Sequence, residues 1–133
     1  MKANFRSLFL AEWIVIGVVI CIFKFTETRL IAGALAGSVF VILGGWIFLT
    51  GLRDRSFRRS LTFWAGCLHL FASSLPLMIT RFLNQTTSFQ EVSVLGLSGP
   101  TFHRLSTSIY MILLVATFID WMRVRRKSVA TAP

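Results

Sequence analysis

Three ionisable side chains lie inside long apolar runs of this 133-residue chain: Glu12, His69 and Asp120. Charged groups are costly in apolar surroundings, so such residues pair with other groups or act in proton and ion movement. The two carboxylates have the chemistry to bind a proton or a cation, and an imidazole can relay protons. Two structural alternatives stay open from the sequence. The acids would pair with Arg6, Arg123 or Arg125, and His69 would donate one hydrogen bond to a neighbouring helix.

A second set of polar residues lies toward the opposite ends of the same runs, and its members are Arg81, His103, Arg104 and Tyr110. The stretch His-Arg-Leu-Ser at 103–106 is similar to the HRxS stretch of the quinone-site anchor subunits of succinate dehydrogenases. It covers four residues, stands at the head of a different span and assigns no family. A redox or quinone-interacting role around His103, Arg104 and Tyr110 is therefore one of three functional hypotheses.

The sequence favours no cofactor. Two histidines on neighbouring helices would suit a haem, but His69 and His103 differ in depth by roughly 15 Å at helical rise. Cys21 and Cys67 also lie at different depths, which speaks against a disulfide. No set of residues has metal-ligand spacing, and no nucleophile motif such as GxSxG occurs. We therefore assign no catalytic residue and no metal ligand, and expect a protein that is not an enzyme.

The elements that must position these residues follow from composition. Hydrophobic residues make up 55% of the chain and charged residues 14%, with a mean hydropathy of +0.73. The apolar residues form four blocks near the length of about 20 residues that crosses a bilayer as helix. Backbone groups in lipid must bond internally, which predicts helices. The prediction is an all-α, polytopic four-transmembrane-helix bundle, a single membrane domain over 1–133, with spans at about 7–23, 30–52, 60–83 and 101–122 and an outer loop at about 83–100.

Charge predicts the orientation. The net charge is +9, and ten of the 14 basic residues fall in the N-terminal tail, the second connection and the C-terminal tail. Four spans place these three segments on one side, and basic residues favour the cytoplasm. We expect both termini to be cytoplasmic, in a bacterial inner membrane. Because the basic residues stand at block ends, they indicate contact with lipid headgroups rather than nucleic acid.

Small and polar residues predict which faces turn inward. Gly33, Gly37, Gly44 and Gly51 form a small-residue stripe on block two, and small residues allow another helix to approach closely. Packing inside the bundle and a dimer interface are the alternatives. Polar stripes recur every three or four residues in the other blocks. They comprise Thr62, Gly66, His69, Ser73, Pro76 and Thr80 in block three, and His103, Ser106, Tyr110, Leu113, Thr117 and Asp120 in block four. Block one has Trp13, Gly17, Cys21 and Lys24 on one line, with Glu12 beside it. Pro76 should kink its helix.

Two further functional hypotheses follow. The first is a structural or accessory subunit of a membrane complex, with the lipid bilayer and other membrane subunits, or further copies of the chain, as partners. The second is a minimal oligomeric transporter or channel that uses Glu12, His69 and Asp120 for protons or cations. The many small-residue positions and the lack of a catalytic motif favour the first.

The topology is testable with single cysteines. In a background carrying Cys21→Ser and Cys67→Ser, we expect Ser88→Cys to react with a membrane-impermeant thiol reagent in intact cells. Ser128→Cys should react only after the membrane is opened, because the basic C-terminal tail favours the cytoplasm. Labelling of Ser128→Cys in intact cells would reverse the predicted orientation.

Overall fold

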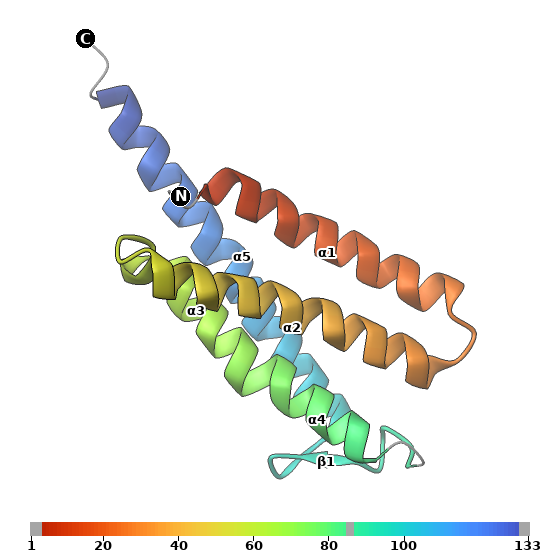
Figure 1. Ribbon diagram of the computed structural model, residues 1–133. Helices are drawn as coiled ribbons and strands as arrows, with labels where there is room; N and C mark the ends of the chain where they lie inside the picture. Colours follow the sequence, from red (N-terminus) through yellow and green to blue (C-terminus); the bar gives the residue numbers. More distant parts are fainter. Residues whose placement is uncertain (1–3, 85–86, 131–133) are drawn as a thin grey trace.

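The computed structural model describes residues 4–84 and 87–130, and these residues are predominantly helical (Figure 1). Helical structure follows from the long apolar runs, whose backbone groups are satisfied within each helix. In chain order the elements are α1 (Phe5–Phe25), α2 (Arg29–Arg53), the 3₁₀ turn η1 (Phe57–Arg59), α3 (Leu61–His69), the π-helical turn η2 (Leu70–Ser74), α4 (Leu75–Leu83), the strands β1 (Ser93–Val94) and β2 (Leu97–Ser98), and α5 (Gly99–Ala130).

Four helical segments are long and apolar enough to cross a membrane: Phe5–Phe25, Arg29–Arg53, Leu61–Leu83 and Gly99–Val129. The third comprises α3, η2 and α4, which run on without a break. The fourth is longer than the predicted block, since α5 has 32 residues. At 1.5 Å per residue it measures roughly 48 Å, more than the roughly 30 Å of a bilayer core. The basic end of α5 therefore extends beyond the apolar layer.

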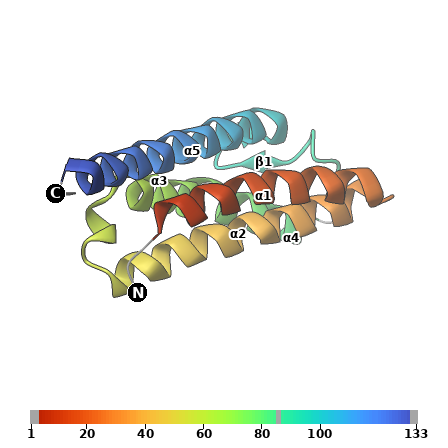
Figure 2. The same cartoon turned by 90° about the horizontal axis from the view of Figure 1, so that it is seen from above.

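The long helices lie side by side, and the chain ends gather at one end of the molecule. Figures 1 and 2 both show the N-terminus, the α2–α3 connection and the C-terminus at one end, with the α1–α2 turn and the strands at the other. α1 packs against α2 and α5, α2 against α3 and α4, and α3 against α5. The described parts of the three basic segments thus share one end.

Side-chain caps fix where the helices start at that end. The Asn4 carboxamide accepts hydrogen bonds from the amides of Arg6 and Ser7. The Ser60 hydroxyl accepts from the amide of Phe63 at 3.1 Å and starts α3. Such caps satisfy first-turn amides that have no partner within the helix. Between α2 and α3, Phe57 is buried and its ring lies 5.5 Å from that of Phe5. The basic connection is therefore held against the helices.

The third span changes helical geometry in its middle. Residues 70–74 form a π-helical turn, in which the amide of Leu75 donates to the carbonyl of Leu70. Pro76 follows at the start of α4, and a proline has no amide to donate to the preceding turn. The π turn absorbs the mismatch, so the irregularity lies N-terminal to the proline. Such turns often occur at functional sites.

The segment after α4 contains a small β-hairpin that the sequence analysis did not anticipate. Ser93 pairs with Ser98 and Val94 with Leu97, antiparallel. Leu95 and Gly96 at its turn have φ of 52° and 81°, as in the two-residue turns that join tight hairpins. Val92 and Val94 are buried with Phe102, and Leu77 packs on them. Burial of these apolar side chains holds the hairpin against α4 and α5.

The buried face of α1 differs from the predicted stripe. Glu12 and Leu8 are its buried residues, whereas Trp13 is 54% exposed and Cys21 is exposed. An added Cβ on Gly17 would meet nothing within 4 Å. The prediction of an inward Trp13–Gly17–Cys21–Lys24 line is wrong. The helix is rotated so that the Glu12 carboxylate reaches hydroxyl partners on α5.

The glycine stripe of α2 lies against the third span. Gly33 meets Arg81, Gly37 meets Met78, Gly44 meets Leu70 and Gly51 meets Phe63. Gly66 of α3 reciprocates by contacting Ile47 of α2. A Cβ on Gly44 would lie 3.0 Å from the Cβ of Leu70, which is closer than ordinary van der Waals contact. The two helices therefore approach closely along most of their length, as small residues allow.

Gly51→Ala and Gly45→Ala provide a matched test of this contact. A methyl group on Gly51 would collide with the Phe63 ring, whereas one on Gly45 would meet nothing within 4 Å. We expect Gly51→Ala to lower the free energy of unfolding by about 1–3 kcal/mol through overpacking. Gly45→Ala should leave it unchanged or slightly raised, because Ala favours helix over Gly. Denaturant titration in micelles measures both, and equal effects would contradict the packing described.

Candidate functional site: a buried polar cluster between the helices

His69 lies at the centre of the helices, on the last turn of α3 before the π turn. Its side chain is buried, and its Nε2 is 3.0 Å from the Ser74 hydroxyl. The imidazole makes edge contacts with Phe40 of α2 and Tyr110 of α5, with ring centroids 5.6 and 5.1 Å away. The π turn brings Ser74 under the imidazole. Nδ1 is buried and has no hydrogen-bond partner among the described residues.

Glu12 lies near His69, at the contact between α1 and α5. The hydroxyl of Thr117 donates to Glu12 Oε1 at 2.6 Å, and the phenol of Tyr110 donates to the Glu12 carbonyl at 2.7 Å. The side chain is fully buried, and Oε2 has no hydrogen-bond partner in the described part of the chain. Tyr110 thus links α1 to the imidazole of His69. We call Glu12, His69, Tyr110, Ser74 and Thr117 the central cluster.

Asp120 has a separate structural setting, at the start of α3. Its Oδ2 accepts two hydrogen bonds from Thr62, one from the amide and one from the hydroxyl, each 2.8 Å long. The amide belongs to the first turn of α3, where the helix dipole favours a negative charge. Oδ1 lies 3.6 Å from Nη1 of Arg123, whose side chain is 62% exposed. Asp120 therefore joins α5 to the N-terminus of α3.

The structure separates the residues that the sequence grouped. In the described chain no hydrogen bond or ion pair joins Glu12 to Asp120, and Glu12 has no arginine partner. Tyr110, expected with His103 and Arg104, lies with His69 instead, because its position on α5 is two turns deeper. Arg81 and His103 line a pocket beside the hairpin, and Arg104 is exposed outside it. Glu12 and His69 thus belong to the central cluster, whereas Asp120 forms a separate cap at the start of α3.

Sequence reasoning overlooked two members of the central cluster and one neighbour. Thr117 was expected on the inward face of α5 but not as a partner of Glu12, and Ser74 was overlooked as a partner of His69. Thr117 is two helical turns from Tyr110, and this spacing indicates that the two side chains share one face of α5. Nothing in the sequence pointed to Phe40, which packs against both rings.

Ser73 adds a further polar link between the third span and α5. Its hydroxyl hydrogen-bonds that of Ser106. Within 4–84 and 87–130, no three His, Cys, Asp or Glu side chains come together as metal ligands would. The cluster can hold a proton on the carboxyl or the imidazole, and it can hold three helices together. It presents no arrangement of nucleophile, base and oxyanion donors among the described residues.

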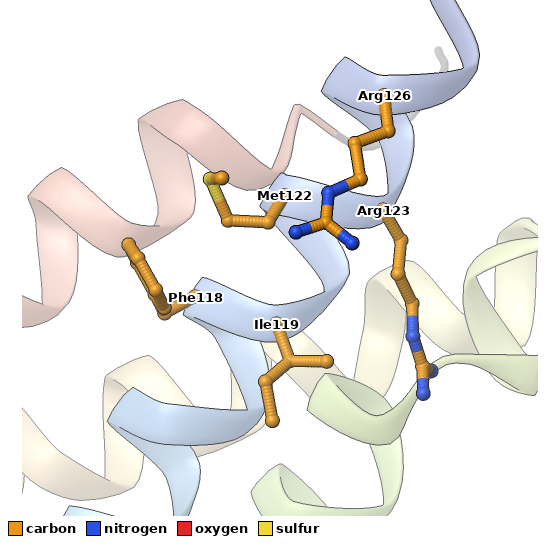
Figure 3. Close-up of a pocket in the computed structure, with 5 residues that line it drawn as sticks. All are labelled: Phe118, Ile119, Met122, Arg123 and Arg126. Atoms are coloured by element: carbon orange, nitrogen blue, oxygen red, sulfur yellow. The ribbon is translucent and has the colours of Figure 1, made fainter.

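A shallow hollow near the C-terminus is a weaker candidate for a functional site. Its volume is about 310 Å³, and it is lined by Phe118, Ile119, Met122, Arg123 and Arg126. Figure 3 shows that all five project from α5 alone. Because one helix face supplies every wall residue, the hollow does not bring together groups from different elements.

Comparison of the chain with protein-family models, curated proteins and solved structures finds no match. The functional assignment therefore rests on the geometry.

Asp120 can be tested against its exposed neighbour. Asp120→Ala leaves the Thr62 hydroxyl and a first-turn amide of α3 without their acceptor, so we expect the free energy of unfolding to fall by about 1–3 kcal/mol. Arg123→Ala removes only a solvent-exposed ion pair and should cost less than about 1 kcal/mol. Thermal unfolding in one detergent compares them. A larger loss for Arg123→Ala would show that the ion pair, rather than the cap, is the important contact.

Proposed function

We propose that this chain is a small integral membrane protein that serves as a non-catalytic accessory subunit of a larger membrane assembly. Its four helices form a transmembrane bundle with both termini on the cytoplasmic side of a bacterial inner membrane. Four helices of sufficient length and apolarity support this placement, and the basic residues at the end that holds both termini support the orientation.

The observation that carries the proposal is how the inward polar side chains are used. Asp120 bonds Thr62, Glu12 bonds Thr117, and Ser73 bonds Ser106, each pair across two helices. In apolar surroundings such bonds contribute to helix association. The polar faces that could have formed a catalytic centre or ion path thus hold the helices together.

α1 is the surface through which we propose that the subunit binds its neighbour. It buries two residues, and its opposite face presents Ile14 at 64% exposure together with Trp13. Gly17 lies one helical turn further along the same helix and is open to approach. A small residue beside large apolar side chains suits the close contact of another transmembrane helix.

A second candidate function is proton-coupled transport through the central cluster. Two observations favour it: Glu12 Oε2 and His69 Nδ1 are buried and have no hydrogen-bond partner among the described residues. A native structure rarely leaves such atoms unsatisfied without a reason. Tyr110, which contacts both residues, would lie between the two proton-binding groups.

Gly17→Leu tests the subunit proposal. Because a side chain at Gly17 meets nothing inside the chain, the variant should fold normally but lose the partner when extracted gently from its own membrane. Gly45→Leu, equally open and on α2, is the control and should keep it. Native mass spectrometry reads both. Recovery of the wild-type chain as a lone monomer would contradict the proposal.

Liposomes separate the two functions. We expect reconstituted wild-type protein to leave an imposed proton gradient intact. Glu12→Gln and His69→Gln should also leave it intact, as the wild type does. Dissipation of the gradient by the wild type, lost in Glu12→Gln and retained in Asp120→Asn, would replace the subunit function by the transport function.

A further inference from the structure

A pocket opens at the end of the molecule that carries the hairpin. Its volume is about 840 Å³, and its walls come from the end of α1, α2, α4, residues 87–90, Val92 and the start of α5. Arg29, Arg81 and His103 line it, and no Asp or Glu is among its described lining residues. Glu27 and Glu91 are close along the chain but are exposed. The pocket is therefore electropositive, on the side where basic residues are few.

Arg81 is held in this pocket rather than extended into water. Long basic side chains near the ends of membrane helices usually reach outward to the interface. The guanidinium carbon of Arg81 instead lies 4.4 Å from the centre of the Phe89 ring. Its Nε is buried and has no hydrogen-bond partner among the described residues. A guanidinium positioned by stacking, with an unused donor, is suited to bind an anion.

Gly33 of α2 provides the space for Arg81. A Cβ at this position would overlap Nη1 of Arg81, so any larger residue would displace the guanidinium. α2 also begins at this pocket, and the side chain of its N-cap residue Thr28 makes no capping hydrogen bond. The start of a 25-residue helix adds positive potential beside Arg29 and Arg81. Three independent features thus favour negative charge at one place.

The wall of the pocket that runs along α2 and Phe82 is largely apolar and continuous with the exposed helix faces. Leu30, Leu35 and Phe82 line it and are 47%, 47% and 67% exposed. Arg29 is the first residue of α2 and Arg81 the third from the end of α4. The cationic groups therefore lie at headgroup depth, while the apolar wall descends along α2. Soluble anions need no such wall, whereas an acyl chain does.

We propose that this pocket binds one anionic phospholipid. Arg81 and Arg29 bind its phosphate, and one acyl chain lies along Leu30, Leu35 and Phe82. Charge-assisted bonds from guanidinium to phosphate are among the stronger polar contacts. The proposal rests on the membrane placement given above and not on the role as a subunit, so loss of a protein partner and loss of lipid binding are separate results.

The test uses the purified full-length chain in nanodiscs of phosphatidylcholine, into which phosphatidylglycerol is titrated. Native mass spectrometry counts retained lipid. We expect the wild type to bind phosphatidylglycerol at least about tenfold more tightly than phosphatidylcholine. Arg81→Gln should reduce that preference about tenfold, corresponding to one lost charged contact. Arg104→Gln, which removes an equal charge on the same side but outside the pocket, should leave it unchanged.

Two further variants keep the proposal falsifiable if Arg81→Gln folds poorly. Gly33→Ala should reduce the preference by displacing the guanidinium, and Ala34→Trp should reduce binding of both lipids by filling the apolar wall. Equal affinity of the wild type for the two lipids would overturn the proposal, as would equal losses in Arg81→Gln and Arg104→Gln. Displacement of phosphatidylglycerol by millimolar inorganic phosphate would show that the site takes a free anion rather than a lipid.

Discussion

The polar face of the third span is the constraint on which the arrangement of the helices depends. Thr62, His69 and Ser73 recur along α3 and η2, and all three are buried. In a segment this apolar, each needs a partner from protein because no water is at hand. Two of the partners, Asp120 and Ser106, come from α5. This requirement explains why α3 and α5 pack along one another and why α5 presents its polar face inward.

An adjacent side of the same span meets the glycines of α2, and the two contacts are complementary. Leu70 and Phe63 fill the space that Gly44 and Gly51 leave open. Dispersion forces act only at short range, so the absent side chains allow more of the two helices to be in contact. α1 has neither a glycine contact nor a long polar face toward its neighbours. It is joined through the hydrogen bonds of Glu12 and the packing of Leu8, Phe5 and Phe9, which leaves its other face available to lipid or another subunit.

The structure has two polar regions at different depths, and each bears on a different functional hypothesis. The central cluster is enclosed by four helices, and its orphaned carboxylate and imidazole atoms are the only described feature that favours proton movement. The second region is the pocket lined by Arg29, Arg81 and His103. It is electropositive, opens beside exposed apolar side chains and is lined in part by residues between 87 and 92. Tyr110 belongs to the first region and His103 to the second, although both lie on α5. The two residues that the quinone hypothesis grouped therefore lie in different regions of the structure.

The sequence by itself determined the four helices, because block length and apolarity leave helix as the only way to satisfy the backbone. It also predicted the inward faces of α3 and the middle of α5 from polar residues at helical spacing. Only the tertiary structure decided the rotation of α1. Periodicity alone favoured Trp13 and Gly17 on its inward face, but the Glu12 carboxylate needs hydroxyl partners and is the group that faces inward. The tertiary structure likewise decided the π turn, the hairpin, and the enclosure of Arg81 by Gly33 and Phe89. The rotation of α1 and the enclosure of Arg81 depend on residues far apart in the chain, whose contacts no local pattern records.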